Sequence, residues 1–389
     1  MFTCCITFSF LCTKEKRIWD QKLMKKCICM LFCLVLCTGC WDQYLMKDVA
    51  LVTALALDQD ENGRLIATAS LPRVPTEKGG ISKATEYVIS SVANTPRENR
   101  IKLHTKISGT YDTAKLLVLL VGDSLAKQDV FSDLDAIYRD PKGALDAKMV
   151  LVKGMAQKVM KKVKIKDETF SEYLSRTLQN AENSNILPNE NMRSIHSKLL
   201  DPGQDFMLPY IQMDSSQSRI EIQGLGMFHH HTYSGKYLTK NQSLLYLLMA
   251  NQLQKGAQIT QKITNNRFIT IHVKHVKRRL EIKKQKKGKL NVLLHMDLKV
   301  DITEDTEEIA HSKKEKNILD QKLEKTLTRD AKNTIKKMQE ANCDALGIGR
   351  RLIAMYPHIW KTFDWEEEYP KAKIVPNMNI HITNQGILN

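Results

Sequence analysis

Cysteine is scarce over most of this 389-residue sequence: eight of its nine cysteines fall within the first 40 residues, and Cys343 lies alone beyond them. If the chain is cut just before Cys40, the mature protein keeps two cysteines. Two cysteines so far apart cannot form a disulfide framework, and their spacing does not fit a zinc site. The sequence therefore predicts a fold that is stabilised by an ordinary packed core.

Aromatic residues and long apolar runs are also rare. Aromatic side chains make up 6% of the residues and charged side chains 26%. Apart from one N-terminal segment, no apolar run approaches the ~20 residues that a spanning helix needs. This composition excludes a polytopic membrane protein and fits a water-soluble body, whose length suits two or three domains.

Acidic residues are too few to balance the basic ones, and the formal net charge is +16. Removing the six basic and two acidic residues of positions 1–39 from totals of 59 and 43 leaves 53 basic against 41 acidic residues. An excess of this size favours anionic neighbours, such as acidic lipid headgroups or nucleic acid.

The N-terminus has the layout of an export signal. Met24-Lys25-Lys26 is followed by an apolar stretch from 27 to 37 and by Thr38-Gly39-Cys40. About 11 apolar residues rise only ~16 Å as a helix, so this stretch cannot span a ~30 Å hydrocarbon core. Residues 1–23 do not fit a signal, and we expect translation to begin at Met24. The sequence thus predicts a signal peptide over 1–39.

Leu36-Cys37-Thr38-Gly39-Cys40 resembles a bacterial lipobox, in which the sulfur of the last cysteine receives diacylglycerol. Buried acyl chains contribute about 0.8 kcal/mol per methylene, so two or three chains anchor a protein stably. Cys37 departs from the pattern, because leucine is usual there. The alternative is a cleaved secretory signal without lipid.

The first half of the body is predicted to alternate short strands with helices. Strands are expected over 49–57, 65–71, 86–92, 115–121 and 149–152. Asn62-Gly63 indicates a hairpin turn. Helices are expected over 130–138 and over 168–200, where Pro188 divides two of them. Residues 201–218 are rich in Gly, Pro, Ser and Asp. We therefore predict a domain over 40–205, a linker over 206–218 and a second domain over 219–389.

The second half is predicted to be a sheet covered by a long helix. Strands are expected over 219–228 and 372–383, the latter at an edge or with a bulge because it contains Pro376, and helices over 241–253 and 344–355. Strict alternation predicts a strand with one buried face, and spacings of three and four predict an amphipathic helix. The strand residues are Leu290, Val292, Leu294, Met296, Leu298, Val300 and Ile302, and the helix residues are Leu319, Leu323, Leu327, Ala331, Ile335 and Met338. The predicted fold class is α+β, with mixed or antiparallel sheets packed by helices.

Short motifs in a fixed order resemble the Ger(x)C family, the lipoprotein C subunits of bacterial spore germinant receptors, over nearly all of residues 24–389. The motifs are Gly39-Cys40-Trp41-Asp42, Ala50-Leu51-Val52-Thr53-Ala54, Arg139-Asp140-Pro141, Leu151-Val152-Lys153-Gly154, Gly224-Leu225-Gly226-Met227-Phe228, Lys336-Lys337-Met338-Gln339-Glu340, Asp344-Ala345-Leu346-Gly347-Ile348-Gly349-Arg350 and Tyr356-Pro357-His358-Ile359-Trp360. Residues 93–113 depart from the family pattern, and Ala54 and Ala56 stand where glycine is common.

The resemblance implies a non-enzymatic subunit that diacylglyceryl-Cys40 anchors to the outer face of the inner spore membrane. It implies an integral membrane A subunit and a transporter-like B subunit as partners in nutrient sensing, with no cofactor and no nucleic acid. Structural roles would fall to Trp41, Asp42, Gly347, Gly349, Arg350, Pro357 and Trp360. A hypothesis from another class is an exported solute-binding lipoprotein that binds a small nutrient directly.

Three features could carry further chemistry, and each has a simpler interpretation. His229-His230-His231 suggests a metal, but consecutive side chains on a strand diverge and no carboxylate stands at good spacing, so we interpret it as a surface loop. Gly347-Ile348-Gly349-Arg350 lacks the Gly-Lys-Ser/Thr ending of a phosphate loop, and its glycines favour a bend or close helix packing. The acids of 364–368 form a solvated turn or meet a basic partner. Cys343 has no nearby histidine that would make it a nucleophile.

A dense basic run surrounds a predicted hairpin tip near residue 287. It comprises Lys274, Lys277, Arg278, Arg279, Lys283, Lys284, Lys286, Lys287 and Lys289. Near an acidic bilayer each such group contributes on the order of 1 kcal/mol. The run is either a membrane or partner patch, which would use the residues from Lys277 onward, or a solvated hairpin. Nucleic acid is disfavoured because no aromatic residues interleave the basic ones.

Overall fold

The computed structural model describes residues 26, 30, 48–73, 85–163, 165, 167–214, 216, 219–254, 256–264, 266–284, 290–306 and 313–385. The chain divides into two compact units, Met1–Val49 and Ala50–Asn389, and nearly all of the described residues belong to the second. Cys40, Trp41 and Asp42 lie outside the described residues, as does most of the predicted signal peptide. Within the described part of the chain, no helix is long and apolar enough to cross a membrane.

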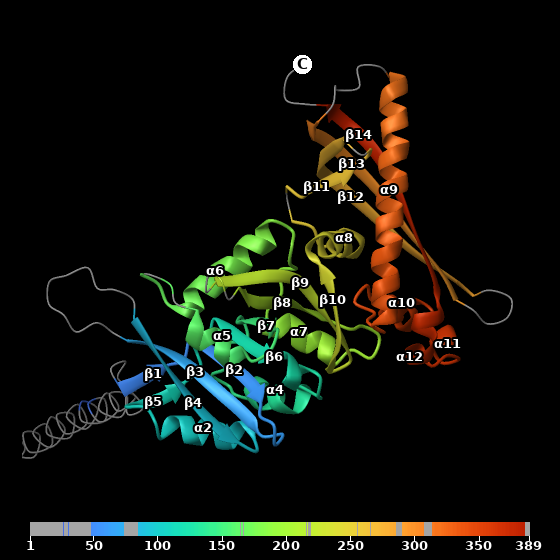
Figure 1. The fold of residues 1–389 in the computed structure, drawn as a ribbon. Coiled ribbons are helices and arrows are strands. Elements are labelled where there is room, and N and C mark those ends of the chain that lie inside the picture. The colour runs from blue at the N-terminus through green and yellow to red at the C-terminus, as the bar shows by residue number, and fades with distance from the viewer. Residues whose placement is uncertain are drawn as a thin grey trace, which may run out of the picture. The chain divides into compact units, whose positions relative to one another are not determined.

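An eight-stranded mixed sheet forms the first layer of the body (Figure 1). In spatial order its strands are β10 (Thr232–Thr239), β9 (Arg219–His229), β8 (Met207–Asp214), β7 (Lys148–Val152), β6 (Val118–Gly122), β2 (Ala54–Gln59), β3 (Leu65–Arg73) and β4 (Thr85–Ala93). The central strands β8, β7, β6 and β2 run parallel, and antiparallel strands flank them on both sides. A separate small sheet pairs β1 (Val49–Leu51) with β5 (Thr110–Asp112).

Helices cover both faces of the large sheet, so the central strand β6 is buried along its whole length. The strand begins at Val118, so Lys115 and Leu117 of the predicted strand 115–121 lie before it and are exposed. Neighbouring residues of each strand point into different clusters, since side chains alternate across a strand. Ala54 and Val118 join one cluster, and Leu55 and Leu119 join the other. The first cluster includes α5 (Ala156–Lys162) and α6 (Phe170–Asn183), and the second includes α2 (Pro96–His104), α3 (Asp123–Ala126), α4 (Phe131–Tyr138) and α7 (Met192–Leu199).

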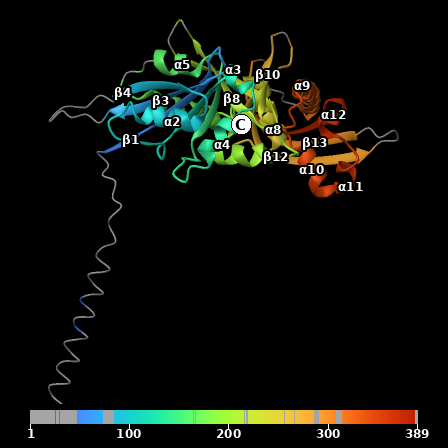
Figure 2. The ribbon, with the colours of Figure 1, turned by 90° about the horizontal axis from the view of Figure 1, so that it is seen from below.

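The C-terminal part is a four-stranded sheet with a long helix against it. Its strands are β11 (Gln258–Lys262), β12 (Phe268–Lys284), β13 (Leu290–Asp305) and β14 (Lys373–Gln385), in that order. Strand β13 buries every second residue from Leu290 to Ile302, as predicted. Pro376 lies in the edge strand β14. Helix α9 (Lys313–Glu340) lies beside this sheet and is viewed nearly along its axis in Figure 2. It packs along β14 and buries its predicted apolar stripe.

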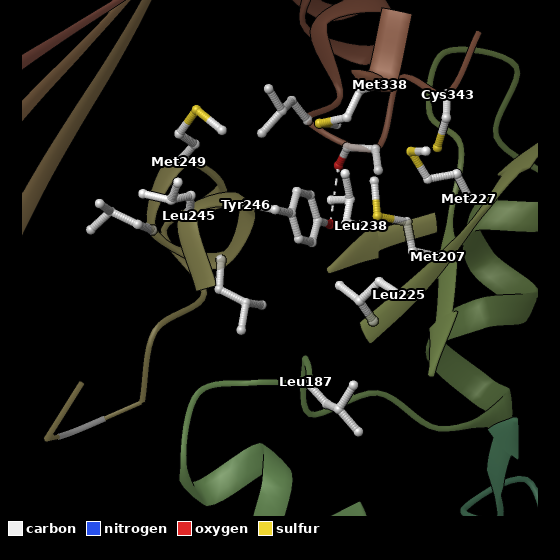
Figure 3. Packing of buried hydrophobic residues seen from close by; sticks show 14 of the residues in the cluster. Leu187, Met207, Leu225, Met227, Leu238, Leu245, Tyr246, Met249, Met338 and Cys343 are labelled. Carbon is white, nitrogen blue, oxygen red and sulfur yellow. Dashed lines mark hydrogen bonds between the residues drawn. The ribbon is translucent and has the colours of Figure 1, made fainter. Parts of the chain in front are cut away.

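Helix α8 (Lys240–Ala250) joins the two sheets. It contacts β9 and β10 on one side and α9 on the other (Figure 1). Its Tyr246 is 1% exposed and lies among Met207, Leu238 and Met338 (Figure 3). One apolar cluster therefore runs without a break from the eight-stranded to the four-stranded sheet.

The segment 206–218 differs from the predicted linker, because most of it forms strand β8. Pro209 is tolerated there since β7 pairs only with Tyr210 and Ile211, which leaves β9 as the one strand beside Pro209. Strands β9 and β10, which lie within the predicted second domain, extend the sheet of the first. The division into two domains stays a prediction, but the sheets do not follow its boundary.

Candidate functional site

The Asp344 motif forms the centre of a junction between the C-terminal helices and the loop before β8. The short helices after α9 are α10 (Ile348–Met355), α11 (Pro357–Trp360), α12 (Trp365–Glu368) and the 3-10 turn η2 (Tyr369–Lys371). Asp344 is 2% exposed. Its carboxylate accepts hydrogen bonds from the amides of Ile348 (3.0 Å) and Gly349 (2.7 Å) and from Nε1 of Trp365 (3.1 Å). It thus satisfies two amides of the first turn of α10 and ties α12 to it.

Burial governs the protonation of Asp344. Loss of hydration raises the pKa of this carboxyl to about 8, against the opposing effect of the amides of Gly349 and Ile348, and the nearby Asp205 adds to the rise. Near neutral pH the folded chain therefore holds a proton that the unfolded chain releases.

Asp205 links the same junction to the turn between β9 and β10. Its carboxylate accepts from the amide of Asp344 at 2.8 Å and from the amide of His230 at 2.7 Å. Its Oδ2 lies 3.6 Å from Nδ1 of His229, and interaction with Asp205 raises the pKa of that imidazole. Two carboxylates on neighbouring loops thus organise three segments that are far apart in the sequence.

Two glycines let these segments meet backbone to backbone. The amide of Arg350 donates to the carbonyl oxygen of Gly203 at 2.6 Å. A Cβ at Gly349 would lie 2.5 Å from Nε1 of Trp365 and 2.9 Å from the oxygen of Gly203, and a Cβ at Gly203 would lie 2.5 Å from the nitrogen of Arg350. Gly347 precedes α10 with φ 68°, a conformation that favours glycine. The prediction was a bend or close packing between two helical segments, whereas these glycines approach Gly203 and Gln204 of the loop before β8 as well as Trp365 of α12.

Two further motif residues, Arg350 and Trp360, lie at the same junction. The guanidinium of Arg350 donates to Oε1 of Gln204 at 3.3 Å and lies 3.5 Å from Oδ2 of Asp201, both on the loop before β8. Pro357 occupies the first turn of α11. The ring of Trp360 lies 6.3 Å from that of Trp365. The structure thus brings Gly347, Gly349, Arg350 and Trp360 together, while Pro357 begins the helix that carries Trp360.

A cavity of about 290 Å³ opens beside this junction. His229, His230 and Glu366 border it, and each offers a possible metal-ligand atom within 4.8 Å of the others. Nε2 of His230 lies 2.7 Å from Oε1 of Glu366. His231 faces elsewhere, with Nε2 3.1 Å from the oxygen of Leu199. No local signal could have revealed this arrangement, because the carboxylate is 136 residues from His230.

The basic run does not form one continuous surface. Lys277, Arg279 and Lys283 are exposed. Arg278 turns inward instead: its guanidinium donates to the carbonyl oxygens of Met249 (2.7 Å) and Leu346 (3.3 Å), and burial lowers its pKa. Arg278 therefore joins α8 to the Asp344 segment and leaves the predicted patch. The side chain of Lys284 and all of Lys286, Lys287 and Lys289 lie outside the described residues.

A larger cavity of about 750 Å³ lies between α2, α4 and the eight-stranded sheet. Its wall is mostly apolar, with Leu55 and Leu103 among the lining residues. Arg100 and Asp140 pair at 2.5 Å in this lining, and Asp140 belongs to the Arg139-Asp140-Pro141 motif. Composition and periodicity gave no sign of this cavity.

Cys343 is fully buried, and burial raises the pKa of its thiol far above the usual value. Its Sγ contacts the carbonyl oxygen of Phe206 at 3.8 Å. A thiol that neither ionises nor meets solvent cannot act as a nucleophile.

Comparison with known proteins extends these observations. The family model "Spore germination protein N-terminal domain" matches residues 42–213, and "Spore germination B3/GerAC like, C-terminal" matches residues 223–386. The spore germination protein GerQC of Bacillus cereus is 24% identical over 366 residues, which is 94% of this chain and 99% of that protein. The spore germination protein KC of Bacillus subtilis (strain 168) is 20% identical over 400 residues, covering 94% of this chain and 98% of that protein.

The fold has a solved counterpart. The crystal structure of the GerBC protein superposes with a TM-score of 0.58 at 17% identity, covering 85% of this chain and 97% of that one. The α+β fold is therefore that of GerBC.

Two successive domain matches on a fold of this kind define a spore germination protein of the C-subunit class. The chain belongs to the Ger(x)C family of germinant receptor C subunits, as its motifs predicted. This family is not a known family of enzymes.

Proposed function

We propose that this chain is a non-catalytic subunit of a germinant receptor, attached to a membrane by diacylglycerol on Cys40. In this proposal the body lies on the outer face of the inner spore membrane and transmits a nutrient signal through contacts with the integral membrane A and B subunits. The observation that carries the proposal is family membership across both halves of the chain, with Gly39-Cys40 standing immediately before the matched region.

The described residues support a role in binding rather than catalysis. The motif residues around Asp344 hold segments together through backbone contacts and one buried carboxylate. Such contacts hold three distant segments in one arrangement and support a structural role for these motif residues.

The exposed part of the basic run is the surface that we propose for the membrane or a partner. Lys277, Arg279 and Lys283 lie at alternate positions along β12, the strand that leads to the turn predicted at the hairpin tip. Two of the three have acidic neighbours, since Arg279 lies 3.9 Å from Asp297 and Lys283 lies 3.6 Å from Glu281. These distances leave the pairs weak, so the cations can exchange acidic neighbours for lipid headgroups.

The test of the anchor is Cys40→Ala in the intact protein. We expect loss of lipid labelling and release from the membrane fraction. Germination should be impaired for the nutrients that this receptor serves and unchanged for other nutrients. Cys37→Leu is the matched control, because it restores the usual residue of the lipobox and should keep the label. Unchanged lipid incorporation in Cys40→Ala would refute the anchor.

The solute-binding alternative has one observation in its favour, the cavity of about 750 Å³ beneath α2. This volume is within the range of small-molecule sites. Calorimetric titration of the purified chain with candidate nutrients separates the two functions. Saturable heat without other subunits would favour direct binding, and none is expected if the chain works by protein contacts.

A further inference from the structure

We propose that His229, His230 and Glu366 form a Zn²⁺ site that clamps the turn between β9 and β10 to helix α12. The three side chains come from two segments more than 130 residues apart, and their potential ligand atoms lie within 4.8 Å of one another. The site borders the Asp344 junction but shares none of the hydrogen bonds made by the Asp344 carboxylate.

The backbone of the turn makes the two histidines converge. Successive side chains of an extended strand point to opposite faces. His230 instead has φ 48°, in the left-handed region, directly after the end of β9. Its ring centroid consequently lies 4.4 Å from that of His229. This conformation removes the objection that neighbouring histidines must diverge.

The donor set fits zinc in both chemistry and distance. Two imidazoles and one carboxylate are the ligands of open zinc sites, where water takes the fourth position, whereas calcium and magnesium prefer oxygen alone. Bonds of 2.0–2.1 Å in a tetrahedron place donor atoms about 3.3 Å apart. Nε2 of His230 and Oε1 of Glu366 already lie 2.7 Å apart, and the two side chains are 46% and 60% exposed, so they can rotate to admit an ion.

A second carboxylate stands behind His229 as an orienting group. Nδ1 of His229 is buried without a hydrogen-bond partner and lies 3.6 Å from Oδ2 of Asp205. Nε2 receives a contact from Nδ2 of Asn342 at 3.3 Å, which places the ring proton on Nδ1, toward Asp205. A carboxylate facing the far nitrogen of a ligating imidazole is the recurring outer shell of zinc sites. Binding an ion at Nε2 would replace the contact from Asn342, whose Nδ2 keeps its hydrogen bond to the carbonyl oxygen of Glu366 at 3.0 Å.

The test measures Zn²⁺ affinity of the full-length chain in detergent, purified without a polyhistidine tag, by competition with a chromophoric chelator. The variants are His230→Gln and Glu366→Gln. The matched control is His231→Gln, because the third histidine of the run bonds to Leu199 and lies 3.3 Å from Asp129, away from the site. Circular dichroism verifies that each variant is folded. If His230→Gln does not fold, Glu366→Gln alone provides the test.

We expect one Zn²⁺ per chain, a loss of affinity of about 10-fold or more in His230→Gln and Glu366→Gln, and no change in His231→Gln. Zinc should raise the thermal unfolding midpoint of the unaltered chain and of His231→Gln, but not of the other two. Co²⁺ in place of zinc should give the visible absorption of a four-coordinate ion. Failure to bind Zn²⁺ at micromolar concentration overturns the proposal. Full affinity in Glu366→Gln also overturns the proposal. That result would mean that surface histidines bind the ion adventitiously and that His230 and Glu366 form only a simple ion pair.

Discussion

Gly349→Ala is the sharpest test of the Asp344 junction. A methyl group at this position would lie 2.5 Å from Nε1 of Trp365 and 2.9 Å from the oxygen of Gly203. Overpacking of this kind costs about 1–3 kcal/mol. Displacing Trp365 also takes one donor from the buried carboxylate of Asp344, at about 1–3 kcal/mol more. Because α10 is a helix, alanine recovers about 1 kcal/mol of propensity. The net loss of unfolding free energy is about 1–5 kcal/mol.

Urea denaturation followed by tryptophan fluorescence measures this loss through the midpoint and slope of the transition. Gly235→Ala is the control, since Gly235 has φ 77° with no atom near its missing Cβ and should lose only about 1 kcal/mol through backbone strain. Gly203→Ala should resemble Gly349→Ala, and the double variant should lose less than the sum, because both disrupt one contact. A Gly349→Ala chain as stable as the unaltered one, or more stable, would refute the reasoning.

Three further predictions concern buried polar groups. Burial raises the pKa of Asp344 from 3.8 to about 8, so the folded state holds a proton that the unfolded state releases. The free energy of unfolding should therefore fall as the pH rises from about 4 to 8. Urea titrations across this range should show a smaller dependence of that free energy on pH for Asp344→Asn, and an equal dependence would contradict the assignment. Arg278→Met should lower the free energy of unfolding by about 1–3 kcal/mol, because two carbonyl oxygens lose their donor. Arg279→Met should change it by no more than about 0.5 kcal/mol. Urea denaturation that gives the reverse ranking would contradict the inward placement of Arg278. Asp58→Asn should lower the thermal midpoint, since the buried carboxylate accepts from the amides that begin α5, while Asp60→Asn in an exposed turn should change it little.

Local patterns determined most of the elements. The alternation of β13 and the apolar stripe of α9 specify a buried face whatever the partner, because side-chain periodicity follows from backbone geometry alone. The turn at Gly63 and the packing glycine Gly349 were predictable for a similar reason, since few residues other than glycine suit such positions. Helix α2 was missed in the segment 93–113, where the sequence departs from the family pattern.

Partnerships between distant segments were decided by the tertiary structure. Strand β9 pairs with β8 and so extends the first sheet instead of beginning a separate second domain. The pattern of apolar residues within β9 does not show which strand it pairs with, because that pairing depends on segments elsewhere in the chain. Arg278 shares the face of β12 with the buried residues Leu280 and Ile282, whereas Arg279 is exposed. Only the tertiary structure supplies the carbonyl oxygens of Met249 and Leu346 that accept from the guanidinium of Arg278.

The approach of His229, His230 and Glu366 to one another also depends on the tertiary structure. Residue types and spacing show three histidines in a row without a carboxylate nearby. One left-handed residue in the turn and the docking of α12 supply both the direction and the missing oxygen ligand. The sequence by itself determined the family, most of the elements and their buried faces, because these depend on local geometry and motif order. The tertiary structure alone decided which side chains meet, because such contacts depend on the packing of segments far apart in the chain.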